Sequence, residues 1–145
     1  YYYISTGTEV NDSAIARLDA AKGAMDLPFA TGGGLQRPYG FDWYNGQLYV
    51  ASFMTDEILV YDAATGDFVE VFAQGNGTEE GLVNGPNQIA IYNGTLYMTT
   101  QGSFIDGNGT LQYGLASQVV AFDLLTGIGR VFAPQPEVMS SAGYV

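Results

Sequence analysis

Residues 38–50 have the sequence Pro-Tyr-Gly-Phe-Asp-Trp-Tyr-Asn-Gly-Gln-Leu-Tyr-Val, and a related sequence, Pro-Asn-Gln-Ile-Ala-Ile-Tyr-Asn-Gly-Thr-Leu-Tyr-Met, occupies residues 86–98. The proline, the Tyr-Asn-Gly triplet and the Leu-Tyr pair fall at the same positions in both stretches. In each, Asn-Gly joins two runs rich in apolar and aromatic residues. This is the strongest short-range signal for a β-hairpin, because both central positions of a type I′ turn need positive φ. The sequence therefore predicts an internal repeat that contains a β-hairpin.

A second motif follows each hairpin and has the form Asp-x-x-Thr-Gly, with lysine in place of threonine in its earliest copy. The three copies of this motif occupy residues 18–23, 61–66 and 122–127. Each copy is followed by a Phe-Ala pair, at residues 29–30, 72–73 and 132–133 respectively. In such a turn the carboxylate accepts backbone N–H groups, and the glycine supplies a left-handed conformation. Because the three aspartates share one turn position, we interpret Asp19, Asp62 and Asp123 as turn caps and not as catalytic carboxylates.

The complete second copy of the repeat predicts four strands, at residues 39–43, 47–52, 57–61 and 68–73. The third strand contains Ile-Leu-Val-Tyr and is apolar on both faces. A strand of this kind must be covered on both sides. A four-stranded antiparallel unit of about 45 residues that is repeated and covered on both faces describes a blade of a β-propeller.

These motifs resemble the repeat of NHL-type, TolB-like six-bladed β-propellers, a superfamily that also includes gluconolactonase-like and streptogramin-lyase-like enzymes. The residues that carry the resemblance are Pro-Tyr-Gly-Phe at 38–41, Gly-Gln-Leu-Tyr-Val-Ala-Ser at 46–52 and Ile-Leu-Val-Tyr-Asp-Ala-Ala-Thr-Gly at 58–66. The resemblance covers nearly the whole chain, and its motifs specify architecture more than chemistry. It implies an all-β protein built from four-stranded antiparallel blades.

The repeat divides the chain into a partial blade at residues 1–34, blades at 35–80 and 81–135, and the start of a further blade at 136–145. Extra length near residues 101–113 is expected between two strands of the third unit. Six blades of about 48 residues need roughly 290 residues, whereas this chain has 145. We therefore expect a segment of a larger propeller, with about two and a half to three blades present. The alternative is that neighbouring copies complete the ring or continue the stack.

Composition excludes several classes of protein. Apolar residues make up 47% of the chain and charged residues 13%, which excludes a disordered chain, and no apolar run is long enough to span a membrane. Fifteen acidic residues against four basic ones give a formal charge of −11, which disfavours nucleic acids and anionic lipid surfaces as partners. The absence of cysteine and histidine removes disulfides, thiolate chemistry and the usual general base near neutral pH.

Four of the asparagines lie in Asn-x-Ser/Thr, the acceptor motif for N-linked glycans, and they are Asn11, Asn76, Asn93 and Asn108. The alternative is that Asn-Gly-Thr serves only as turn chemistry, which by itself would account for Asn93. In a blade, Asn11, Asn76 and Asn108 fall in loops on one face. Enzymatic propellers usually have their ligand sites on this face, so sugars there would crowd an active site. We therefore predict N-glycosylation and a secreted or cell-surface location.

Two positions have the chemistry of a divalent-cation ligand. Residues 106–110, Asp-Gly-Asn-Gly-Thr, place oxygen ligands at alternate positions as in a calcium loop, but no later acidic residue completes the loop. We interpret Asp106 as part of a polar turn. Asn87 begins the first strand of its unit, where the resemblance to gluconolactonase-like proteins implies a divalent metal held by acid and amide side chains. No acidic residue stands beside Asn87, which argues against a metal site there. We predict no catalytic residue and no cofactor, and a divalent cation is the alternative left open.

One position breaks the repeat. Arg17 occupies the place that Val60 and Ala121 hold in the other units. Either this face of the first unit is more hydrated, or the guanidinium pairs with an acid.

Two classes of function remain. The first is a secreted or cell-surface, N-glycosylated propeller that acts as a non-catalytic scaffold or binding module, for a protein or carbohydrate ligand, in an extracellular assembly. The second is a lactonase- or hydrolase-like, metal-dependent propeller enzyme whose active site lies mostly outside these residues. The expected structural partners are the rest of the propeller or neighbouring copies of the chain.

Overall fold

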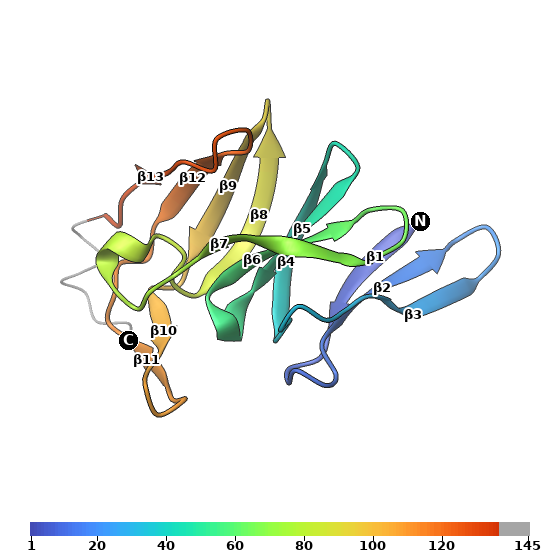
Figure 1. Ribbon diagram of the computed structural model, residues 1–145, viewed down its shortest axis with the longest axis horizontal. Helices are drawn as coiled ribbons and strands as arrows, with labels where there is room; N and C mark the ends of the chain where they lie inside the picture. The colour runs from blue at the N-terminus through green and yellow to red at the C-terminus, as the bar shows by residue number, and fades with distance from the viewer. Residues whose placement is uncertain (137–145) are drawn as a thin grey trace.

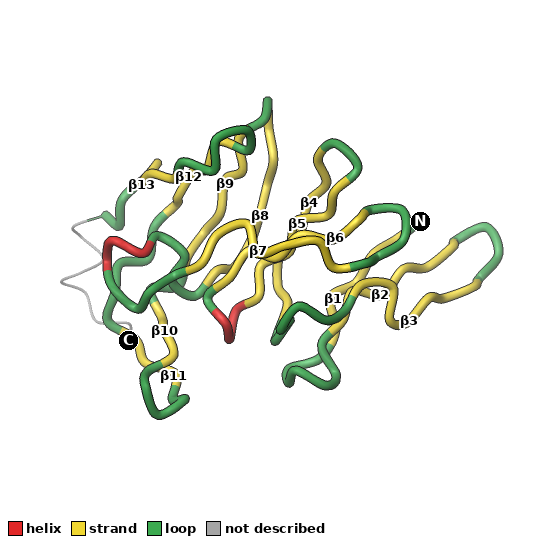
Figure 2. The backbone as a smooth tube through the Cα atoms, in the orientation of Figure 1, coloured by secondary structure: helices red, strands yellow, loops and turns green. Residues whose placement is uncertain are grey.

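The computed structural model describes residues 1–136, and the predicted all-β fold class is confirmed. Short 3-10 turns, η1 (Phe53–Thr55) and η2 (Glu79–Gly81), interrupt the strands (Figure 2). Within residues 1–136 no helix has the length and apolar character needed to cross a membrane. The strands of the described residues are β1 (Tyr2–Thr6), β2 (Ala14–Asp19), β3 (Ala24–Ala30), β4 (Pro38–Tyr44), β5 (Gln47–Ser52), β6 (Glu57–Asp62), β7 (Phe68–Gln74), β8 (Pro86–Tyr92), β9 (Thr95–Thr100), β10 (Ser103–Ile105), β11 (Leu111–Tyr113), β12 (Val119–Asp123) and β13 (Gly129–Ala133).

Three successive antiparallel sheets, which we call blades, lie side by side along the molecule (Figure 1). Blade 1 has the strand order β1-β2-β3, blade 2 has β4-β5-β6-β7, and blade 3 has β8-β9-β12-β13. The strands of these blades lie within the units expected at residues 1–34, 35–80 and 81–135. The expected start of a further blade at 136–145 lies, apart from Pro136, outside the described residues.

Blade 2 follows the sequence prediction closely, because its local signals are strong. Each of its four strands begins and ends within one residue of the predicted position. The turn between β4 and β5 has φ of 47° at Asn45 and 78° at Gly46, and the turn between β8 and β9 has 48° at Asn93 and 74° at Gly94. Both residues of each turn are left-handed, as a type I′ hairpin requires.

The core lies between the blades. The side chains of β6 alternate between two apolar clusters, as the apolar character of both its faces predicts: Leu59 and Tyr61 pack toward blade 1, and Ile58 and Val60 pack toward blade 3. The cluster between blades 1 and 2 contains Ile15, Phe29, Ala30, Leu35, Leu48, Val50, Leu59 and Tyr61. The cluster between blades 2 and 3 contains Tyr49, Ala51, Ile58, Val60, Val83, Ile89, Leu96, Met98, Val120 and Phe122.

The extra length of the third unit forms a separate hairpin. Strands β10 and β11 pair antiparallel, with Ser103 opposite Tyr113 and Ile105 opposite Leu111, and they lie between β9 and β12 in the chain. Strand β10 contacts η1 of blade 2. The insertion therefore bridges neighbouring blades at one end of the structure.

The antiparallel strand order gives the blades two ends. The connections β1–β2, β3–β4, β5–β6 and β7–β8 and the β10–β11 hairpin lie at one end, which we call the loop face (Figure 1). The shorter turns β2–β3, β4–β5, β6–β7, β8–β9 and β12–β13 lie at the other end, the turn face.

Candidate binding pocket

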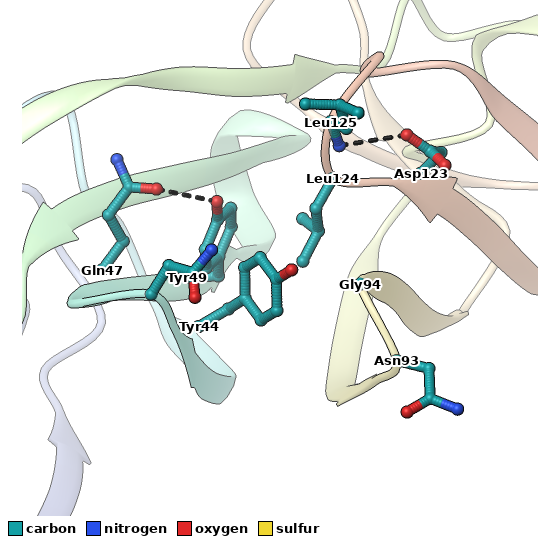
Figure 3. Close-up of a pocket in the computed structure, with 9 residues that line it drawn as sticks. Tyr44, Gln47, Tyr49, Asn93, Gly94, Asp123, Leu124 and Leu125 are labelled. Atoms are coloured by element: carbon teal, nitrogen blue, oxygen red, sulfur yellow. Dashed lines mark hydrogen bonds between the residues drawn. The ribbon is translucent and has the colours of Figure 1, made fainter.

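A pocket of about 330 Å³ lies on the turn face at the junction of blades 2 and 3 (Figure 3). This volume is at the lower end of the range for small-ligand sites. The β4–β5, β8–β9 and β12–β13 turns surround it. Its lining residues are Tyr44, Asn45, Gln47, Tyr49, Asn93, Gly94, Asp123, Leu124 and Leu125.

Hydrogen bonding and packing hold the polar side chains of this pocket in place. The buried Tyr49 hydroxyl donates to Gln47 Oε1 at 2.9 Å, and burial raises the pKa of Tyr49. The Tyr44 hydroxyl points toward Leu124, whereas the Asn93 amide points away from the Tyr44 ring (Figure 3). A Cβ at position 94 would lie 3.3 Å from the Tyr44 hydroxyl, and φ there is 74°, so a glycine keeps this side of the pocket open.

The β12–β13 turn gives the pocket an apolar rim. Leu124 packs against the core, and its N–H donates to the Gly94 carbonyl at 2.9 Å. Leu125 is 94% exposed. Blades 1 and 2 have two alanines at these two turn positions. None of the lining residues is basic, so the site combines amides, phenols and a carboxylate with an exposed leucine.

The three repeated aspartates are turn caps, as the sequence predicts. Asp62 Oδ1 accepts the N–H groups of Ala64 and Thr65, each at 2.8 Å. Asp123 Oδ1 makes the same contacts one blade later, and Asp19 caps the β2–β3 turn. Hydrogen bonds from these turns, chiefly the backbone N–H of Thr65 and of Thr126, lower the pKa of Asp62 and Asp123.

A double substitution, Asp62→Asn with Asp123→Asn, is expected to destabilise the protein more at pH 7 than at pH 3. A carboxylate whose pKa is lowered by folding stabilises the fold above its unfolded pKa of about 4 and loses that contribution as pH falls through the folded pKa. The urea midpoints of the double variant and the wild type should therefore converge on acidification. Glu80→Gln, an exposed acid outside these turns, is the control. If the difference in urea midpoint between the double variant and the wild type did not change with pH, the capping role would be contradicted.

The loop face is joined by a recurring inter-blade hydrogen bond. The residue just before the third strand of a full blade accepts an N–H from a left-handed residue of the next blade's entry loop. Ser13 Oγ accepts the N–H of Arg37 at 3.0 Å, and Asp56 Oδ1 accepts that of Gly85 at 2.7 Å. Arg37 and Gly85 have φ of 52° and 62°. Sequence reasoning missed both contacts, although each acceptor holds the same position in the repeat.

Asp56 is the one of these two acceptors that carries a charge. It is 7% exposed, and its main-chain carbonyl also accepts the N–H of Gly75 at 2.7 Å. Burial raises its pKa, which backbone hydrogen bonds from Gly85 and Ile105 partly offset. Because Ile105 belongs to β10, Asp56 connects blade 2 both to the entry of blade 3 and to the inserted hairpin.

The four glycosylation-motif asparagines are exposed and lie on both faces. Asn11 lies in the β1–β2 loop, Asn76 in the β7–β8 connection and Asn108 at the tip of the β10–β11 hairpin, so these three lie on the loop face. Asn93 lies in the tight β8–β9 turn beside the pocket. Asn76 Oδ1 accepts the N–H and the hydroxyl of Thr78, at 3.0 and 2.7 Å, and these contacts do not use the amide nitrogen to which a glycan attaches.

The two candidate metal ligands lie on different elements. Asp106 Oδ1 accepts the N–H groups of Asn108 and Thr110, each at 2.9 Å, and Oδ2 accepts Gln112 Nε2 at 2.9 Å. These contacts, chiefly that from Thr110, lower the pKa of Asp106 and describe a capped polar turn. Asn87 is half-buried at the start of β8. Across residues 1–136, no group of three or more His, Cys, Asp or Glu side chains could hold a metal ion.

The position that breaks the repeat carries an ion pair. Arg17 Nε and Nη2 donate to Asp26 Oδ2 at 3.0 and 2.7 Å, and Nη1 donates to the Ala64 carbonyl of blade 2 at 3.3 Å. The guanidinium carbon lies 4.0 Å from the centroid of the Phe29 ring. Of the two alternatives predicted for Arg17, pairing with an acid is the one observed.

Comparisons with known proteins place the fold. No protein-family profile matches this sequence, and no curated protein matches it significantly. Among solved structures, a nidogen/laminin complex matches with a TM-score of 0.63 and 17% identity over 91% of this chain and 43% of that chain. A puromycin hydrolase structure matches with a TM-score of 0.47 and 15% identity, over 86% of this chain and 18% of that chain. This chain thus spans less than half of either structure, and its architecture is that of β-propeller blades.

Proposed function

We propose that this chain is part of a secreted or cell-surface, N-glycosylated β-propeller of the NHL-type, TolB-like kind, which acts as a non-catalytic binding module or scaffold. The observation that carries the proposal is the exposure of three glycosylation-motif asparagines, Asn11, Asn76 and Asn108, on the loop face. Sugars at these sites would crowd the loop face and leave the pocket on the turn face accessible.

The outer flanks of blades 1 and 3 support a place in a larger propeller. Tyr2 and Ile4 of β1 occupy the positions that Leu48 and Val50 bury against blade 1, yet both are exposed. At the other flank, Phe132 holds the position of Phe72 and is 52% exposed. Exposed apolar surface in the pattern of a buried junction favours further blades, of the same propeller or of neighbouring copies, as its cover.

Glycopeptide mass spectrometry on the protein from its native source tests the proposal. We expect hexosamine-bearing peptides at Asn11, Asn76 and Asn108, and the lowest occupancy at Asn93, because its turn is tight and left-handed. Enzymatic removal of N-glycans should convert the modified asparagines to aspartates. Unmodified asparagine at all three loop-face sites would contradict the proposal.

A further inference from the structure

The place equivalent to the pocket lies one blade earlier, on the turn face between blades 1 and 2, and there it is occupied by a side chain of the protein itself. There, the guanidinium of Arg17 pairs with Asp26, reaches the Ala64 carbonyl and lies over the Phe29 ring. It also lies 5.0 Å from the centroid of the Tyr1 ring. The side chain is 22% exposed, so an arginine of the chain itself occupies this junction.

Strand register shows which residues of blade 2 are equivalent. In blade 1, Tyr3 pairs with Arg17, which pairs with Asp26 across the sheet. In blade 2, Tyr49 pairs with Val60, and Val60 pairs with Glu70. The aromatic and acidic positions are therefore retained, while the arginine position holds a valine too short to reach the turn face.

The remaining contacts of Arg17 also have counterparts at the pocket. The position of Tyr1 is taken by Gln47, that of Tyr3 by Tyr49, and that of Ala64 by Leu125. All three counterparts line the pocket. The pocket thus has the counterparts of Tyr1, Tyr3 and Ala64 in its lining, without those of Asp26 and Phe29 and without a basic side chain.

Blade 3 strengthens this comparison. Its arginine comes from the neighbouring strand: Arg130 holds the position of Asp26 and Glu70, and its guanidinium lies 5.6 Å from the centroid of the Phe132 ring. Among the described residues, this pair of facing positions includes an arginine in blade 1, Arg17, and in blade 3, Arg130. In blade 2 the same pair is Val60 and Glu70, without an arginine.

We infer that the pocket between blades 2 and 3 binds a guanidinium from outside the chain, the side chain of an arginine on a partner protein. The inference rests on the proposed role as a binding module. Gln47, Tyr49 and Leu125 line the pocket and offer oxygen acceptors for the five N–H donors of a guanidinium. Glu70 is not a lining residue, but its negative charge lies near enough to Tyr49 to help raise the pKa of that phenol. The formal charge of −11 attracts a basic partner.

The exposed apolar side chains beside the pocket favour a protein ligand over a free small molecule. Leu125 is 94% exposed beside the pocket, and Ile128, on the same turn, is 70% exposed. Exposed apolar side chains that surround a polar anchor site are typical of protein interfaces. The partner arginine would enter the pocket while neighbouring apolar groups of the partner cover these two side chains.

Titration of the isotope-labelled full chain with N-acetylarginine methylamide, followed by amide NMR, tests the inference. Saturable shifts are expected at the Gln47 side-chain amide and at the Leu125 backbone amide, but not at Ala64, where Arg17 already binds. The citrulline analogue, which is neutral and has the same shape, should produce none of these shifts. No saturable shift with the arginine probe at millimolar concentrations, or an equal response to the citrulline probe, would overturn the inference.

Substitutions sharpen the test. Glu70→Gln should weaken binding of the arginine probe roughly fivefold at low salt, while Glu80→Gln on the loop face should leave it unchanged. Val60→Arg should fill the pocket with a guanidinium of the chain and abolish binding; if that variant does not fold, Glu70→Gln still decides. Unchanged affinity in Glu70→Gln would overturn the inference. Glycan occupancy on the opposite face is measured separately, so failure of the proposed function and failure of this site are distinguishable.

Discussion

Gly40→Ala is expected to destabilise the protein by about 3 kcal/mol, because overpacking at a close contact strains both partners. Gly40 lies in β4, the strand of blade 2 that packs against β8 of blade 3. A Cβ at this position would lie 2.5 Å from the Ile89 nitrogen, 2.6 Å from the Asn87 carbonyl oxygen and 2.6 Å from the Gln88 Cα. All three atoms belong to the backbone, so no side-chain rotation relieves the clash, and the blades must separate.

Urea unfolding, followed by tryptophan fluorescence, measures this effect through Trp43 in the same strand. Gly107→Ala is a matched control: position 107 has no heavy atom within 4 Å of a built Cβ, and its φ is not left-handed. The control should keep the wild-type midpoint while Gly40→Ala lowers it. Equal midpoints for the two variants would show that β4 and β8 are not packed as closely as described.

The strands and turns were predictable because their signals are local. Asn-Gly fixed the two hairpins, the Asp-x-x-Thr-Gly motif fixed its turns through contacts two and three residues apart, and the apolar run at residues 58–61 required two buried faces. Each of these depends on neighbouring residues alone. That is why the strands of blade 2 were placed to within one residue.

The pocket and the inter-blade contacts were not predicted, because they depend on how blades pack. Gly40 looks like any strand glycine until β8 is placed against it. Val60 stands where blade 1 has Arg17, a difference that the repeat showed but whose consequence required the position of the neighbouring blade. The family resemblance to NHL-type propellers likewise predicted blades, while the structural comparisons extend only to the propeller fold.

Asp56→Ala is expected to cost about 3 kcal/mol at pH 7, because it leaves the buried N–H group of Gly85 without its acceptor, at about 1–3 kcal/mol for such a group. Alanine also tolerates the left-handed φ of 53° at this position poorly. Asp56→Asn separates the two causes, since asparagine accepts this conformation and keeps one acceptor oxygen, so its cost should be smaller. Ser13→Ala, which removes the equivalent uncharged acceptor, should cost less than Asp56→Ala.

The pH dependence separates the effect of the Asp56 charge from that of its hydrogen bonds. Burial raises the pKa of Asp56, so the folded state holds this proton more tightly than the unfolded state. The contribution of this carboxyl to stability therefore increases as pH falls through its folded pKa toward its unfolded pKa of about 4, opposite in sign to that of Asp62 and Asp123. The stability of the wild type relative to Asp56→Asn should rise over this range in urea unfolding series. A relative stability that is constant or falls on acidification would show that the carboxyl is not buried between blade 2 and the β10–β11 hairpin.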